Sequence, residues 1–265
     1  MWVKKIGSAF VALTLAVAVV AVLSGPTEAA GQKCRNIAHR AMYKHTEEQV
    51  RGVRENARWG FTEVDARITK DNKIVALHDF TMARPSGGRS REAVGSLTLR
   101  QIRNIRFVLG RRVETIRRLI RTAGKVGSPI MVTINSYKKY QTKWDNGGLE
   151  ALWTAARNHP RPSRVFFGGA GAEKAMREKF PKASIFHRYE AGDAILKRAT
   201  THGVDLVGIP VRNFSRRLVR KLRAEGIWPA TNQLNRKRHV RLAQRARITL
   251  MQTDRSRRTV RRWCR

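Results

Sequence analysis

Short apolar runs alternate with amphipathic segments along almost the whole chain of 265 residues. Strand-like runs occupy residues 35–39, 61–68, 73–78, 129–134, 164–169, 183–188, 205–211, 227–231 and 248–253. Helix-like segments lie between them, at residues 46–58, 98–105, 113–126, 147–158, 171–179, 191–201, 214–225 and 235–246. Such alternation is typical of βαβ units and a parallel sheet. About eight units predict a single-domain (β/α)8 TIM barrel, an α/β fold, with a doubly wound open sheet as the alternative.

The first 30 residues have the pattern of a signal peptide. Lys4 and Lys5 precede the apolar run IGSAFVALTLAVAVVAVLSG, and the small residues of GPTEAA follow it. We therefore expect residues 1–30 to be cleaved and a secreted domain to span residues 31–265. Because the apolar run is long, an uncleaved membrane anchor is the alternative.

Two cysteines lie at opposite ends of the expected mature domain, Cys34 and Cys264. An even number of cysteines in an exported protein favours a disulfide. A closed barrel brings its first and last strands together, so a bridge between these two residues is geometrically sensible. Two free thiols, or a bridge between molecules, are the alternative.

The net charge is +36, from 55 lysines and arginines against 19 acidic residues. Within the basic runs, apolar residues recur at helical spacing, so the arginines are expected on the outer faces of helices. A solvated surface explains this pattern better than a specific nucleic-acid site. Such a field would still attract polyanions or an anionic membrane surface without specificity at low salt. The runs are RRLIR (117–121), RRLVRKLR (216–223), RKRHVRLAQRAR (236–247) and RSRRTVRRW (255–263).

The stretch FTEVDARITKDNKIVALHD (61–79) places two carboxylates, Glu63 and Asp65, two residues apart in a chain that has few. In a strand, Glu63 and Asp65 point to the same side and repel each other unless a cation lies between them. A divalent metal or a cation bound with substrate would serve, and the solvated face of an exposed hairpin is the alternative.

Three signals converge on one end of the predicted barrel. His39 and Arg40 end the first strand, Glu63 and Asp65 lie on the second, and His78 with Asp79 ends the third. Catalytic residues of such barrels lie at the carboxyl ends of the strands. We therefore expect these residues to meet at one rim.

Several motifs together resemble the glycerophosphodiester phosphodiesterase family, a TIM-barrel family of the phosphatidylinositol-phosphodiesterase-like superfamily. AHR (38–40) is similar to its His-Arg-Gly, and EVD (63–65) to its Glu-x-Asp metal pair. TKDNKIVALHDFTMAR (69–84) follows the family's turn, return strand and His-Asp segment. Weaker matches are SGG (86–88), SLTL (96–99), GIWPATN (226–232) and QTDR (252–255).

This resemblance implies metal-dependent hydrolysis of a glycerophosphodiester to glycerol 3-phosphate and an alcohol. It implies that His39 and His78 are the acid/base pair, a role suited to a pKa near neutrality. Arg40 would bind the phosphate through its guanidinium. Glu63 and Asp65 would hold Ca²⁺ or Mg²⁺, because both ions prefer oxygen ligands.

The chain also departs from the family pattern. Ala41 stands where the family has Gly, which matters if the backbone there has a positive φ. TEEQ (46–49) replaces Pro-Glu-Asn-Thr, leaving Glu47 or Glu48 as the substitute for its glutamate. In IMVTINS (130–136), the family's Glu-x-Lys becomes Thr133 and Asn135. A metal-binding carboxylate is then missing, so Thr133 could complete only a weaker, hydrated metal site.

Three functions are consistent with the sequence. The first is a secreted hydrolase of lipid metabolism that acts on glycerophosphodiesters released from phospholipids, or on glycerol-phosphate polymers. The second is a catalytically weakened or silent barrel that binds phosphate-rich polymers or anionic surfaces. The third is a phospholipase similar to sphingomyelinase D, which the TKD and HD segments disfavour. Retention of both histidines and of the Glu-x-Asp pair favours the first.

Overall fold

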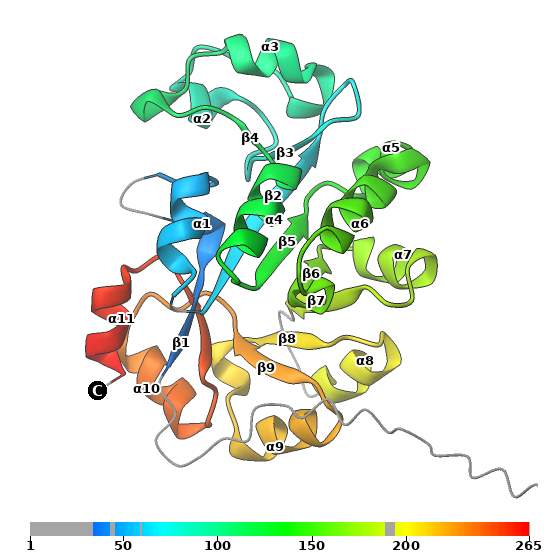
Figure 1. Ribbon diagram of the computed structural model, residues 1–265. Coiled ribbons are helices and arrows are strands. Elements are labelled where there is room, and N and C mark those ends of the chain that lie inside the picture. The colour runs from blue at the N-terminus through cyan, green and yellow to red at the C-terminus, as the bar shows by residue number, and fades with distance from the viewer. Residues whose placement is uncertain (1–33, 43–45, 59, 189–193, 265) are drawn as a thin grey trace, which may run out of the picture.

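Eight parallel strands close into a barrel in the computed structural model, which describes residues 34–42, 46–58, 60–188 and 194–264. Each strand pairs in parallel with the next, and the last pairs with the first, as Figure 1 shows. The (β/α)8 prediction is therefore confirmed, and the open sheet is excluded. The barrel strands are β1 (Arg35–Ala38), β2 (Gly60–Ile68), β5 (Ile130–Ile134), β6 (Val165–Gly168), β7 (Ser184–Arg188), β8 (Leu206–Ile209), β9 (Trp228–Thr231) and β10 (Leu250–Thr253).

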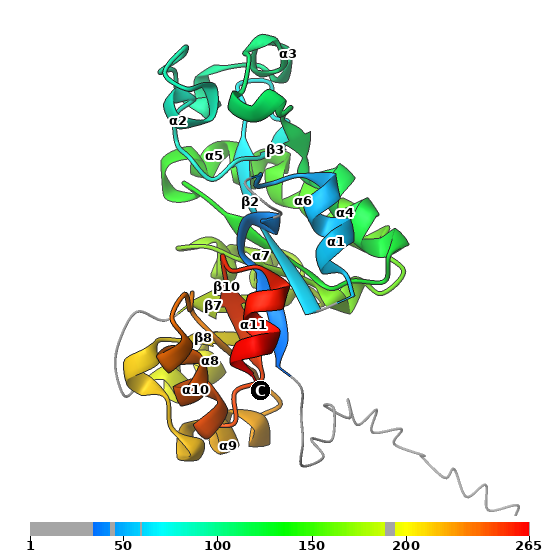
Figure 2. The ribbon, with the colours of Figure 1, turned by 90° about the vertical axis from the view of Figure 1, so that its left-hand side faces the viewer.

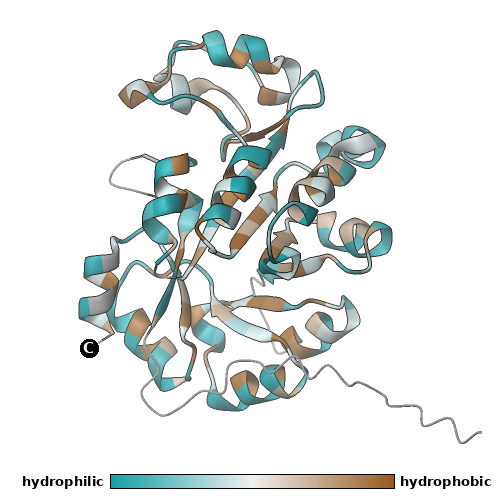
Figure 3. Ribbon diagram, viewed as in Figure 1, coloured by the Kyte–Doolittle hydropathy of each residue, from teal (hydrophilic) through white to brown (hydrophobic). Residues whose placement is uncertain are grey.

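Helices surround the strands, and two views at right angles show them as the outer layer (Figures 1 and 2). Their apolar faces turn inward: Leu119 and Ile120 are buried, whereas Arg117 and Arg121 of the same helix are exposed. Figure 3 shows the resulting hydrophilic outer faces. The helices of this layer are α1 (Val50–Asn56), α4 (Ile116–Lys125), α6 (Leu149–Arg157), α7 (Ala172–Lys179), α8 (Ile195–Thr201), α9 (Arg216–Ala224), α10 (Lys237–Arg245) and α11 (Arg257–Trp263).

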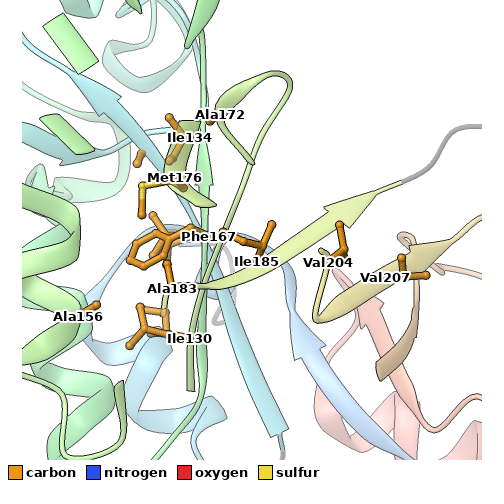
Figure 4. Close-up of a cluster of buried hydrophobic side chains, with 14 of the residues drawn as sticks. Ile130, Ile134, Ala156, Phe167, Ala172, Met176, Ala183, Ile185, Val204 and Val207 are labelled. Atoms are coloured by element: carbon orange, nitrogen blue, oxygen red, sulfur yellow. The ribbon is translucent and has the colours of Figure 1, made fainter. Parts of the chain in front are cut away.

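The larger core lies between strands and helices. Figure 4 shows part of it, where Phe167 of β6 and Ile185 of β7 lie among side chains that include Met176 of α7. All three side chains are fully buried. Burial of this apolar surface provides the main force holding the helices against the barrel.

A second core fills the inside of the barrel at the amino-terminal end of the strands. Each strand contributes one buried side chain to it: Ile37, Phe61, Met131, Phe166, Phe186, Leu206, Ala230 and Leu250. The barrel interior is therefore packed, as is usual for this fold. Because side chains alternate along a strand, the residues two positions further on also face inward, nearer the carboxyl ends.

The prediction that the strand before His78 is the third barrel strand was wrong, whereas its interpretation as a return strand after the TKDN turn is confirmed. This strand, β3 (Ile74–Ala76), is antiparallel to β2 and pairs on its other side with β4 (Glu114–Thr115). Only residues 69–73 separate β2 from β3, too few for the crossover that a parallel neighbour needs. Because β2 extends past its neighbours, β3 returns along it, and Leu77 N–H donates to Asp65 O at 2.9 Å. His78 thus reaches the rim by a hairpin.

The hairpin carries an insertion with a small core of its own, which lies beyond the end of β2 (Figures 1 and 2). It contains α2 (Ala83–Ser86) and α3 (Leu99–Asn104), and Thr98 caps α3 through a capping box. A further short helix, α5 (Gln141–Lys143), follows β5. The polar segment 81–96 therefore has its own packed structure.

The two ends of the barrel domain are joined covalently. Cys34 precedes β1 and Cys264 follows α11, and they form a disulfide with a Cα–Cα distance of 6.1 Å. This confirms the predicted pairing, which closes the seam between β1 and β10. The expected signal peptide, residues 1–30, lies outside the described residues. Among the helices of the described chain, none is long and apolar enough to span a membrane.

Candidate active site

A polar layer lies directly above the apolar core inside the barrel. It consists of inward-facing residues two positions beyond that core: His39 after β1, Glu63 on β2, Thr133 on β5 and Arg188 on β7. The pairing of β2 with β5 sets Asp65 opposite Thr133, so the alignment predicted for this strand places Thr133 beside the carboxylates. The alternation of side chains along each strand and the register between strands thus determine which residues form this layer.

Glu63 is the most enclosed member of this layer, with no exposed surface. Its Oε1 accepts hydrogen bonds from Thr133 Oγ1 at 2.6 Å and Arg188 Nη2 at 3.1 Å. Its Oε2 accepts from the backbone N–H of Arg40 at 2.9 Å. Burial opposes ionisation, but the positive charge of Arg188 and these hydrogen bonds lower the pKa of Glu63 below its usual value. The exposed-hairpin alternative is excluded.

Asp65 is also buried, and its environment differs from that of Glu63. Asn135 Nδ2 donates to its Oδ1 at 2.6 Å, whereas its Oδ2 has no hydrogen-bond partner among the described residues. Burial and the neighbouring Glu63 charge raise the pKa of Asp65. The Nε atom of Arg40 lies 3.9 Å from that Oδ2.

Of the two glutamates considered after the first strand, Glu48 lies in the buried cluster. Its carboxyl oxygens accept from the backbone N–H of Asp65 at 3.2 and 3.3 Å. Burial, together with Asp65 and Glu63, raises the pKa of Glu48 well above its usual value. Glu47 instead pairs with Arg40 at 3.3 Å and with Arg84 at 2.5 Å.

These carboxylates do not fit the expected Ca²⁺ or Mg²⁺ well. Such ions take six or more oxygen ligands, several from carboxylates or water. Both oxygens of Glu63 already accept hydrogen bonds, and Asp65 Oδ2, which has no partner among the residues that the structure describes, is buried beside Arg40. Within the described part of the chain, no three histidine, cysteine or acidic residues are grouped so that they could hold a metal. The metal expected from the sequence stays a prediction.

His39 is buried and held by an aspartate that sequence reasoning had left unassigned. Its Nδ1 lies 2.6 Å from Oδ1 of Asp254, just beyond β10. Gln233 and Asn235 donate to the other oxygen of Asp254, Asn235 at 2.7 Å. Burial opposes ionisation of Asp254, but the hydrogen bonds from His39, Asn235 and Gln233 hold its pKa below the usual value. Its position at the end of the last barrel strand was the signal that could have identified it.

His78 has a similar partner on its ring. Its Nδ1 lies 2.9 Å from Oδ1 of Asp79, and Arg84 donates to the other oxygen of Asp79 at 2.5 Å. Arg67, which faces into the barrel two residues beyond Asp65, donates from Nε to the carbonyl oxygen of His78 at 2.9 Å. The His78 side chain is 40% exposed, compared with 9% for His39. Both histidines therefore have Nδ1 held by an aspartate.

The backbone at Arg40 and Ala41 is left-handed, with φ values of 54° and 49°. The second value shows why a glycine suits position 41: the conformation is costly for any residue with a Cβ. The turn points the Arg40 N–H at Glu63, while its Nη1 contacts Glu47. Arg40, the residue predicted to bind phosphate, therefore lies in a strained left-handed turn.

The family model described as "Glycerophosphoryl diester phosphodiesterase family" matches residues 39–257. No curated protein matches the chain.

Solved structures share the fold at low sequence identity. An Oleispira antarctica phosphodiesterase, solved in complex with the product sn-glycerol-3-phosphate, is 14% identical with a TM-score of 0.71, and the match covers 83% of this chain and 92% of that one. A glycerophosphodiester phosphodiesterase from Thermotoga maritima is 16% identical with a TM-score of 0.68, over 85% and 96%. One from Parabacteroides distasonis is 14% identical with a TM-score of 0.68, over 84% and 94%.

Proposed function

Because the chain belongs to the glycerophosphoryl diester phosphodiesterase family, we propose that it hydrolyses glycerophosphodiesters to glycerol 3-phosphate and an alcohol. The observation that carries this proposal is the pair of histidines, each with Nδ1 held by an aspartate, at 2.6 Å for His39 and 2.9 Å for His78. An aspartate on Nδ1 fixes the ring and leaves Nε2 to accept or donate a proton. The product in the related Oleispira structure supports a substrate of this class.

The two histidines divide the proton transfers of the reaction. One removes the proton of the glycerol hydroxyl next to the phosphate, and this oxygen bonds to phosphorus. The bond from phosphorus to the alcohol breaks, and the other histidine protonates the departing oxygen. Water then opens the cyclic phosphate with the proton transfers reversed, yielding glycerol 3-phosphate. Arg40 binds phosphate oxygens, and no step here needs the Ca²⁺ or Mg²⁺ expected from the sequence.

We further propose that the enzyme acts outside the cytoplasm as a secreted protein. The disulfide between Cys34 and Cys264 supports an oxidising compartment. The glycerophosphodiester would then be a product of phospholipid breakdown, or a unit of a glycerol-phosphate polymer.

Hydrolysis of glycerophosphocholine by the purified domain, residues 31–265, tests the activity. We expect turnover that His39→Ala and His78→Ala each abolish. His202→Ala is the matched control, because His202 is exposed beyond α8 and should leave turnover unchanged. An intact lipid substrate assayed in parallel would detect a phospholipase. Absence of hydrolysis with and without divalent cations would refute the proposal and favour a binding protein.

A further inference from the structure

A guanidinium occupies the place between β2 and β5 where the sequence predicted a metal. Arg188 Nη2 lies 3.1 Å from Oε1 of Glu63 and 2.7 Å from Oγ1 of Thr133. Arg188 comes from β7, 125 residues beyond Glu63 in sequence, so it reaches this pair across the barrel. The residue that replaces the expected carboxylate, Thr133, is thus a direct partner of the arginine.

The barrel is built to admit this side chain. Arg188 pairs in register with Gly208 on β8. A Cβ at position 208 would lie 3.0 Å from Cγ of Arg188 and 2.5 Å from Oδ1 of Asn232. Because a Cβ there would crowd the stem of Arg188, the glycine keeps space for the arginine in the polar layer.

The charge and exposure of Arg188 suit a phosphate. Glu63 has no exposed surface, whereas the Arg188 side chain is 31% exposed. The contacts to Glu63 and Thr133 both use Nη2, and Nε and Nη1 have no hydrogen-bond partner within the described ranges. A guanidinium can bind two phosphate oxygens at once, and it neutralises phosphate charge as a metal would.

We propose that Arg188 takes the place of the divalent cation, so that the site binds and activates the phosphodiester without Ca²⁺ or Mg²⁺. Glu63 and Thr133 then hold the guanidinium in position, and its remaining N–H groups face the substrate phosphate. The proposal rests on the phosphodiesterase function proposed above.

Two measurements on the unmodified protein test the proposal. Glycerophosphocholine turnover should be the same, within twofold, in excess chelator and in millimolar Ca²⁺ or Mg²⁺. Titration calorimetry with each metal alone should detect no binding site. Turnover that chelator removes and either metal restores would overturn the proposal, as would a single metal site in calorimetry. If the protein hydrolyses nothing, the proposed function fails, and calorimetry alone still decides the metal question.

Substitution of Arg188 tests its part in the reaction. Arg188→Ala should lower kcat/KM by about 10²–10³-fold, the effect expected when a group that stabilises transition-state charge is lost. Arg188→Lys should recover part of this loss, because an ammonium keeps the charge but not the planar fork. Arg220→Ala is the matched control: Arg220 is exposed on α9, and its loss changes the net charge equally. Equal turnover by Arg188→Ala and Arg220→Ala would overturn the proposal.

A double substitution should restore what the family pattern has and this chain lacks. Thr133→Glu with Arg188→Ala adds a carboxylate and removes the competing cation, so we expect calorimetry to detect a Ca²⁺ or Mg²⁺ site. Circular dichroism would first establish that the variant is folded. A folded double variant that binds metal no better than the unmodified protein would contradict the idea that Arg188 replaces the ion.

Discussion

Removing the disulfide should strongly destabilise the barrel without changing its native structure. Cys34 and Cys264 are 230 residues apart in sequence, so the bridge closes a loop that is nearly the whole domain. In the chain-entropy model, a loop of this length restricts the unfolded state by about 5 kcal/mol. In the native state the bridged ends remain near each other, because β1 pairs with β10 along all four residues of each strand. Removing the bridge should therefore lower the free energy of unfolding mainly by raising the conformational entropy of the unfolded chain.

Urea unfolding of the oxidised and reduced domain measures this difference. We expect the reduced protein to be less stable by up to about 5 kcal/mol, equivalent to a melting temperature lower by about 10–20 °C for a domain of this size. The slope of the unfolding free energy against urea should increase on reduction, because the unlinked chain is more expanded when unfolded. The variant Cys34→Ser/Cys264→Ser should match the reduced protein. Equal stability of the oxidised and reduced forms would show that the bridge does not restrict the unfolded chain.

Four further outcomes follow from the structure. Asp254→Asn should lower kcat by about 10²–10⁴-fold with little change in KM, because His39 loses the carboxylate on Nδ1; an unchanged kcat would leave Asp254 without a catalytic role. Ala41→Gly should raise the unfolding free energy by about 0.5–1 kcal/mol in urea, since φ at this residue is 49°; destabilisation would argue against backbone strain there. Burial and the nearby Arg164 lower the pKa of His159, whose Nδ1 accepts from the Arg161 N–H, so the native state disfavours its protonation. Stability should therefore be lost as the pH falls below about 6.5, and His159→Gln should reduce this loss; equal pH profiles would exclude His159 as the cause. Adsorption to anionic vesicles should weaken steeply with salt, and salt-independent binding would rule out the arginine surface as its origin.

The barrel strands could be predicted within one or two residues because each is a short apolar run bounded by polar residues. The exception was β3, which was counted among the barrel strands although the short turn before it indicated an antiparallel return strand. TKDN (69–72) is a turn in which the Thr69 hydroxyl donates to Asp71 at 2.6 Å and Asn72 has a φ of 57°. A turn this short permits only a hairpin.

A position at a strand end predicts that a residue can belong to the site, but not which side chain it contacts. His39, Arg40, Glu63 and Asp65 share one rim because consecutive parallel strands end at the same side. Arg188 and Asp254 could not be paired with their partners, because the contacts join residues 125 and 215 positions apart. No local pattern encodes such contacts, which depend on barrel closure and register.

Charge balance explains why Thr133 and Arg188 belong together. Glu63 of this layer and the neighbouring Asp65 bring two carboxylates together, and Arg188 and Arg40 lie 3.1 and 3.9 Å from them. A divalent cation added to this set would leave an uncompensated positive charge inside a chain whose net charge is already +36. Thr133→Glu alone would therefore supply a new partner for Arg188 more readily than a metal ligand. When the arginine is also removed, only Arg40 of these two arginines remains beside Glu63, Asp65 and the introduced carboxylate, and this larger negative charge favours binding of Ca²⁺ or Mg²⁺.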